Sequence, residues 1–161
     1  MTIKVGDKIP AGTMMTMGPD GPKPVSSDEL FAGKKVVLFG LPGAFTPTCS
    51  AKHLPGYVEK AGELKAKGVD TIACMSVNDA FVMNAWGKDQ KVGDAVMMLA
   101  DGSADYAKAL GLDLDLTARG MGMRARRFSM LVEDGVVKAV NIEENPGEAK
   151  ASGAETMLSQ L

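Results

Sequence analysis

Hydrophobic residues along the chain form short blocks separated by Gly, Pro, Asn and Asp, which is typical of alternating strands and helices. Two continuous apolar runs, 35–41 and 69–77, are rich in β-branched residues and predict strands buried on both faces. Asp134 and Gly135 form a hairpin signal between two further apolar runs. The predicted strands are 14–17, 35–41, 69–77, 96–99, 128–132 and 136–140.

Between these strands, apolar residues recur at the spacing of amphipathic helices. Ser27 is predicted to cap the first helix, Asn78 or Asp79 the third, and Gly68 to end the second. The predicted helices are 27–31, 49–67, 80–87, 104–110 and 152–161. This order favours the α/β class, with a mixed sheet, helices on both faces and an antiparallel hairpin at one side. Ligands of such folds bind at the carboxyl ends of the strands.

Length and composition limit the classes of protein to consider. The chain of 161 residues is expected to form one domain, residues 1–161, with the Gly/Pro-rich stretch 18–24 as a loop. The composition, 45% hydrophobic and 24% charged with a net charge of −2, is that of an ordinary soluble protein and argues against a nucleic-acid partner. We see no secretory signal and no membrane span, so we expect a cytoplasmic protein without a membrane partner.

The two cysteines, Cys49 and Cys74, are separated by 24 residues. They form neither a C-x-x-C redox pair nor a cluster with zinc-ligand spacing, so we expect no metal and no cofactor. In a reducing cytosol both thiols are expected to be free at rest. The functional question is then whether either thiol is reactive.

Cys49 lies in the most informative segment, 41–50, which joins a buried strand to a helix. In the first helical turn, the free N–H groups and the positive end of the helix dipole favour a thiolate. Pro47 suits entry into a helix, and Thr46 and Thr48 offer hydroxyl donors. A buried, unreactive cysteine would also fit this position, and the local chemistry alone leaves both interpretations open.

A longer pattern around Cys49 favours the reactive interpretation. Pro42, Thr46 and Cys49 form P-x-x-x-T-x-x-C, the signature of the peroxiredoxins. The stretches that resemble the type II, or peroxiredoxin-five-like, subfamily are PGAFTPTCSAKHLPGY (42–57), VNDAFVMNAW (77–86) and RRFSMLVEDG (126–135). The resemblance extends from about Ile3 to Leu161.

This resemblance implies a thioredoxin fold in a single redoxin domain, and reduction of hydrogen peroxide or alkyl hydroperoxides. It implies that Cys49 is the peroxidatic cysteine, with Thr46, Pro42 and Arg127 around it. It also implies a homodimer that packs near the active-site loops. Interface candidates are Phe45, Phe81, Trp86 and the segment 121–123, all of which would equally suit the core.

Elementary chemistry agrees with these roles. A more acidic thiol is more fully ionised but is a weaker nucleophile, so acidity alone adds little to the rate. The rate must come from groups that recognise the stretching O–O bond. The Thr46 hydroxyl suits a peroxide oxygen, Arg127 suits the thiolate and the developing charge, and Pro42 would shield the sulfur from water. The product is a sulfenic acid on Cys49.

Two other residue patterns have competing interpretations. The arginines 119, 124, 126 and 127 could bind phosphate, although the adjacent Gly120-Met121-Gly122 lacks the third glycine of a dinucleotide loop. We expect Arg127 to point inward and the others to lie at the surface or an interface. His53, four residues after Cys49, could be the base of a Cys–His hydrolase, but no orienting Asp or Asn is evident. A histidine that hydrogen-bonds near the site fits better.

Cys74 lies within a strand pattern and is expected to be a core residue rather than a resolving cysteine. Some relatives carry a resolving cysteine near the C-terminus, but the segment 147–153 of this chain contains none. We therefore expect a one-cysteine cycle regenerated by an external thiol, with glutaredoxin and glutathione as first choice and thioredoxin as second. The alternatives are a general thiol–disulfide oxidoreductase and a peroxide sensor or redox-relay or chaperone protein with slow turnover.

Overall fold

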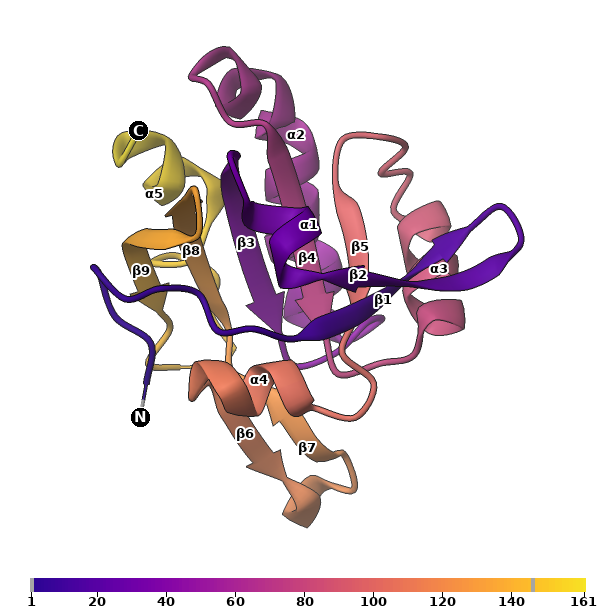
Figure 1. The fold of residues 1–161 in the computed structure, drawn as a ribbon. Coiled ribbons are helices and arrows are strands. Elements are labelled where there is room, and N and C mark those ends of the chain that lie inside the picture. Colours follow the sequence, from indigo (N-terminus) through magenta and orange to yellow (C-terminus); the bar gives the residue numbers. More distant parts are fainter. Residues whose placement is uncertain (1, 146) are drawn as a thin grey trace.

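A mixed seven-stranded sheet runs through the centre of the molecule (Figure 1). The computed structural model describes residues 2–145 and 147–161. The strands, in their order across the sheet, are β2 (Gly21–Ser26), β1 (Thr13–Gly18), β5 (Met97–Ala100), β4 (Thr71–Ser76), β3 (Lys35–Leu41), β8 (Phe128–Glu133) and β9 (Val136–Ile142). The central strands β3, β4 and β5 are parallel, and the antiparallel hairpins β1-β2 and β8-β9 form the two sides. The α/β class and the mixed sheet are as predicted.

Helices cover both faces of this sheet, as the alternating elements indicated (Figure 1). The helices are α1 (Ser27–Phe31), α2 (Leu54–Ala66), α3 (Ala80–Asp89), α4 (Asp105–Leu110) and α5 (Ala154–Ser159). Alternate residues of β3 divide between two cores, with Phe39 packed in the core under α2, α3 and α5, and Leu38 in the core under α1 and α4. Both residues are fully buried, which explains the continuous apolar run of this strand.

Local sequence signals account for several boundaries. The Ser26 side chain, one residue before the predicted cap, accepts a hydrogen bond from the Glu29 N–H at the start of α1 (3.1 Å). Asp79 accepts from the Val82 N–H (2.8 Å) and caps α3, as one of the two expected residues. Asp134 and Gly135 adopt the positive φ values (46° and 77°) of the predicted hairpin turn.

The expectation that 18–24 forms a loop is wrong. Only the turn before Gly21 is a loop, and Pro22 and Pro24 lie in β2, paired with Met17 and Met15 of β1. Because β2 is an edge strand, it needs hydrogen bonds on one side only. The two prolines are two residues apart, so their backbone nitrogens lie on the same side of β2. Both can therefore face away from β1, where no N–H is needed.

A small second sheet was not predicted. It consists of β6 (Asp113–Leu116) and β7 (Gly122–Ala125), joined through the short 3-10 turn Thr117–Arg119. Figure 1 shows this hairpin projecting from the body of the molecule beside α4. Its return strand leads directly to the buried Arg127.

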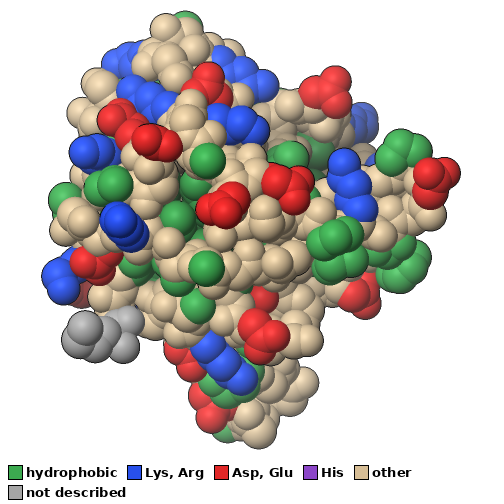
Figure 2. All heavy atoms as spheres, viewed as in Figure 1, with side chains coloured by type: hydrophobic (Ala, Val, Ile, Leu, Met, Phe, Trp, Pro, Cys, Tyr) green, Lys and Arg blue, Asp and Glu red, His purple; other side chains and the backbone are tan. Residues whose placement is uncertain are grey.

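Among the residues described, no helix is long and apolar enough to cross a membrane. On the face seen in Figure 2, Lys and Arg side chains are interspersed with Asp and Glu rather than gathered in one basic patch.

Candidate active site

The loop after β3 carries the candidate nucleophile at the carboxyl ends of β3 and β4. It begins at the buried Pro42 and is tied to the end of β4, because the Ala44 N–H donates to Asn78 Oδ1 (3.0 Å). Ser76 donates to the same oxygen (2.6 Å). Phe45 follows in the left-handed region (φ 64°), where a residue with a side chain is strained. The tether from β4 thus holds an irregular loop in one conformation.

Cys49 opens a π-helical turn, Cys49–His53, that precedes α2. The Leu54 N–H donates to the Cys49 carbonyl, five residues back rather than four. Pro55 explains the wider turn, because it has no N–H to offer the Ala51 carbonyl and its ring would clash there in a continuous α-helix. The helix expected from about residue 49 is present: it runs without a break from Pro47 into α2, with the π-helical turn Cys49–His53 inside it.

Arg127 lies against the sulfur of Cys49. Its Nη2 donates to Cys49 Sγ at 3.1 Å, and both residues are buried (3% and 0% exposed). Arg127 immediately precedes β8 and points inward, as predicted. A fixed guanidinium at this distance stabilises a thiolate and any negative charge that develops beside it.

His53 holds the other nitrogen of the same guanidinium. Arg127 Nη1 lies 3.0 Å from His53 Nδ1, and since an arginine only donates, Nδ1 must be the unprotonated, accepting nitrogen. The ring proton is then on Nε2, which donates to the Ser152 carbonyl (3.1 Å). Burial, followed by the charge of Arg127, lowers the pKa of His53 from its ordinary 6.5 to about 3. The imidazole is neutral at physiological pH and hydrogen-bonds near the site, as expected.

Tyr57, one helical turn after His53, shares the same acceptor. Its hydroxyl donates to the Ser152 carbonyl (2.8 Å), and its ring stacks on Phe39 of β3 (centroids 4.0 Å apart). Burial raises the pKa of Tyr57, so the hydroxyl remains a donor. Sequence reasoning missed Tyr57 and Ser152, because only the tertiary fold brings residue 152 to the start of α2.

Thr46 and Pro42 lie on the loop that ends at Cys49. The Thr46 hydroxyl donates to the Gly43 carbonyl (2.7 Å), and the Thr46 carbonyl accepts from the Ser50 N–H (2.9 Å). The buried Trp86 of α3 supports the turn between Thr46 and Ser50 by donating to Ser50 Oγ (3.1 Å).

Arg124 is a further residue of the site that sequence reasoning assigned to the surface or an interface. Its Nη1 donates to the Pro42 carbonyl (3.2 Å) and its Nε to the Met121 carbonyl (2.8 Å). It is half-buried and connects the β6-β7 hairpin to the active-site loop, whereas Arg119 is exposed. The cluster of arginines therefore divides among different structural roles.

Cys74 lies in the middle of β4, paired with Phe39 and Met98, and is fully buried. It belongs to the same core as Cys49. Burial, and next the neighbouring Cys49, raises the pKa of the Cys74 thiol, so at rest it is a protonated core residue.

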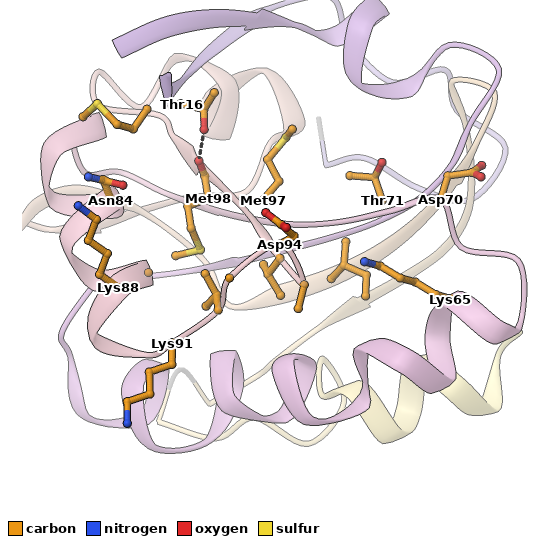
Figure 3. Close-up of a pocket in the computed structure, with 17 residues that line it drawn as sticks. Thr16, Lys65, Asp70, Thr71, Asn84, Lys88, Lys91, Asp94, Met97 and Met98 are labelled. Atoms are coloured by element: carbon orange, nitrogen blue, oxygen red, sulfur yellow. Dashed lines mark hydrogen bonds between the residues drawn. The ribbon is translucent and has the colours of Figure 1, made fainter. Parts of the chain in front are cut away.

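A cavity of about 530 Å³ lies elsewhere, at the amino ends of β4 and β5 (Figure 3). Thr71 and Met97 line it together with Lys65 from the far end of α2 and Lys88 of α3. None of its lining residues carries a thiol or an imidazole. The buried thiol of Cys49 and the imidazole of His53 lie away from this cavity, in the segment that follows the carboxyl end of β3.

Comparisons with known proteins agree with this geometry. The Redoxin family model matches residues 4–158. The chain is 56% identical to peroxiredoxin-2E-2, chloroplastic, of Oryza sativa subsp. japonica, covering 99% of this chain and 73% of the relative. It is 52% identical to peroxiredoxin-2B of Arabidopsis thaliana, over 99% and 98% of the two chains.

A solved peroxiredoxin structure also matches the fold of this chain. Reduced Prx3 of Vibrio vulnificus in complex with hydrogen peroxide superposes with a TM-score of 0.93 at 50% identity, covering 98% of each chain. Fold, sequence and the arginine-bound thiol agree, and the chain belongs to the type II peroxiredoxins, peroxidases with a redoxin domain on a thioredoxin-like fold.

Proposed function

We propose that this peroxiredoxin reduces hydrogen peroxide and alkyl hydroperoxides through a sulfenic acid on Cys49, in a one-cysteine cycle completed by an external thiol. The observation that carries the proposal is the contact of Arg127 Nη2 with Cys49 Sγ (3.1 Å) in a buried site. The environment of Cys74 supports the one-cysteine cycle, because a protonated thiol in the middle of β4 is poorly placed to attack the Cys49 sulfenic acid.

In the first step the Cys49 thiolate attacks one peroxide oxygen. The S–O bond forms, the O–O bond breaks, and the departing oxygen takes a proton and leaves as water or an alcohol. Arg127 stabilises the negative charge on sulfur and on the departing oxygen. The Thr46 hydroxyl, whose own proton is donated to the Gly43 carbonyl, orients the peroxide by accepting a hydrogen bond from it, and Pro42 keeps water from the sulfur.

In the second step an external thiolate attacks the Cys49 sulfenic acid, releasing water and forming a mixed disulfide. A second thiol then frees Cys49 and restores the reduced enzyme. We favour glutathione with glutaredoxin over thioredoxin as the source of these thiols. Because Cys49 is fully buried, the start of the π-helical turn must open for a protein reductant to reach it.

Steady-state turnover with two single variants tests the cycle. Cys49→Ser should abolish peroxide consumption in a glutaredoxin–glutathione assay, while Cys74→Ala should retain it within about threefold. Loss of turnover in Cys74→Ala, with a folded protein, would show that the cycle needs two cysteines. Fast oxidation of Cys49 with no turnover on any of these thiols would indicate a peroxide sensor or relay instead.

We further infer that residues 1–161 act as one domain in the reducing cytoplasm, as a homodimer. The rings of Phe45 and Phe81 support a dimer beside the active-site loop, since they are 53% and 65% exposed. Trp86, another interface candidate, is fully buried and belongs to the core. The segment 121–123 is half-buried and stays a candidate.

A further inference from the structure

Four buried residues close a ring of hydrogen bonds behind Cys49. Arg127 Nη1 donates to His53 Nδ1 (3.0 Å), and His53 Nε2 donates to the Ser152 carbonyl (3.1 Å). Ser152 donates to Glu143 Oε2 from its N–H (2.7 Å) and its hydroxyl (2.5 Å). The Glu143 N–H then donates to the Arg127 carbonyl (2.9 Å), so the ring begins and ends on Arg127.

Glu143 is the one carboxylate in this ring. It follows β9 directly and is only 6% exposed, whereas the next residue, Glu144, is exposed. A buried carboxylate is costly unless its oxygens accept hydrogen bonds. Here they accept from Ser152 twice and from the Ala151 N–H (3.3 Å). These contacts fix the position of the Ser152 carbonyl, which is the acceptor for the His53 ring.

The ring constrains a group that is flexible by itself. An arginine side chain has several rotatable bonds, but its planar guanidinium is fixed in orientation once two of its nitrogens are held. Nη2 is held by the Cys49 sulfur and Nη1 by His53. The His53 ring can serve only while its proton stays on Nε2, and the Ser152 carbonyl keeps it there.

We propose that Glu143 is a positioning residue of the peroxidase reaction, which acts through Ser152 and His53 on the Arg127 guanidinium. The inference rests on the proposed roles of Cys49 and Arg127. Glu143 does not touch the reacting sulfur, and its effect is to hold the cation at the sulfur in one orientation before peroxide arrives. A small displacement of this cation lowers the reaction rate, because stabilisation of the transition state depends on a charge that is already in position.

The first test compares Glu143→Ala with Glu144→Ala, an adjacent and exposed glutamate. Stopped-flow measurement should show that Glu143→Ala slows oxidation of Cys49 by hydrogen peroxide about 10- to 100-fold. Glu144→Ala should react at the wild-type rate. A folded Glu143→Ala protein that is oxidised as fast as wild type would overturn the proposal.

The second readout is spectroscopic and would not respond to a merely structural role. His53 is the only histidine in the chain, so a ¹⁵N-histidine-labelled sample gives a single imidazole. Wild type should show one tautomer, with the proton on Nε2. Glu143→Ala should populate both tautomers, because the Ser152 carbonyl is then held by Tyr57 alone and the His53 ring can also turn away from Arg127. Slow oxidation with an unchanged tautomer would contradict action through His53.

A double-mutant cycle locates the path. In His53→Asn the amide oxygen can still accept from Arg127, but the side chain no longer reaches Ser152. Adding Glu143→Ala to this background should slow oxidation by less than about twofold. If the two losses multiply, Glu143 acts by another route and the ring is not the cause.

Two controls complete the design. If Glu143→Ala does not fold, Glu143→Gln replaces it and should slow oxidation of Cys49 about threefold. In the His53→Asn background this effect should again disappear. A threefold effect that persists in that background overturns the proposal. Cys49→Ser separates the two levels of inference. Peroxide consumption that survives in Cys49→Ser defeats the proposed function, whereas wild-type behaviour of the Glu143 variant defeats only its positioning role.

Discussion

At the scale of the residue, the site is defined by one cation shared between a sulfur and a neutral imidazole. Arg127 contacts Cys49 through one terminal nitrogen and His53 through the other. A lysine would carry the same charge but has a single nitrogen on a flexible stem. Geometry, and not charge alone, therefore distinguishes this site from a simple electrostatic contact.

Arg127→Lys should accordingly slow oxidation of Cys49 by about 10- to 100-fold although the positive charge is retained. Arg126→Lys is the matched control, since Arg126 is only half-buried and precedes the site residue. Rapid-mixing kinetics with hydrogen peroxide measures both. Equal rates for Arg127→Lys and wild type would reduce the role of Arg127 to its charge.

His53 should also make the stability of the protein depend on pH. Its pKa is about 3 in the folded protein, whereas the unfolded chain takes up a proton near the ordinary value of 6.5. As pH falls from about 6.5 to 3, the unfolded state binds the extra proton, so the free energy of unfolding falls by about 1.4 kcal/mol per pH unit from this group. Above pH 6.5 the contribution is constant.

Urea unfolding of wild type and His53→Leu at several pH values measures this effect. The difference in slope between the two proteins isolates His53 from the carboxylates that also titrate in acid. At pH 7, His53→Leu should have a lower free energy of unfolding than wild type, because the hydrogen bonds of the imidazole are lost. Toward pH 4, its free energy of unfolding should decline less steeply than that of wild type. Parallel pH dependences would mean that the imidazole is protonated in the native state.

At the scale of the element, β3 and β8 pack closely beside the site, where the Phe128 ring lies against the backbone of Gly40. Gly40 of β3 pairs with Phe128 of β8, the residue after Arg127. A Cβ on Gly40 would lie 2.2 Å from Cε1 of the Phe128 ring, which is fully buried and cannot move aside freely. Glycine at position 40 is thus a packing requirement.

Gly40→Ala should lower the free energy of unfolding by about 2 kcal/mol through overpacking. Gly62→Ala, in the exposed part of α2 with nothing within 4 Å of the new Cβ, should raise it by about 1 kcal/mol. Chemical denaturation measures both variants. A neutral Gly40→Ala would mean that the Phe128 ring can move without cost.

The elements also show which features a sequence predicts. The apolar run 35–41 and the Asp134-Gly135 turn are local signals, and both were read correctly. The prolines of β2 were misread, since local propensity does not reveal that a strand lies at an edge. The π-helical turn depends on Pro55 in a helix that packs on β3, and the contacts of Glu143 and Ser152 join segments that are distant in the sequence.

The motif around Cys49 was easier to predict than the groups that support it. Cys49, Thr46 and Pro42 occur within one short stretch, whose spacing is itself the signal. Arg127 required the resemblance to a family, because it lies 78 residues away from Cys49 in the chain. His53 was close enough in sequence to be noticed, but its partner became apparent only in three dimensions.

At the scale of the whole molecule, two exposed rings, Phe45 on the active-site loop and Phe81 on α3, support the proposed dimer. Phe81 of α3 is 65% exposed, and Phe45 lies in the strained loop conformation. We propose that wild type is a dimer, and Phe81→Glu should then shift it to a monomer by placing a charge in the proposed apolar interface. Light scattering coupled to size exclusion measures this, with Glu144→Ala as a surface control. A dimer mass for both proteins would place the interface elsewhere, and a monomer mass for wild type would contradict the proposed dimer.

The most direct test of the account is intact mass spectrometry with peptide mapping after fully reduced protein meets one equivalent of hydrogen peroxide. We expect one added oxygen on Cys49 and a free Cys74. Loss of two hydrogens, with Cys49 linked to Cys74, would contradict the one-cysteine cycle. No change at Cys49 within minutes would contradict its role as the peroxidatic thiol.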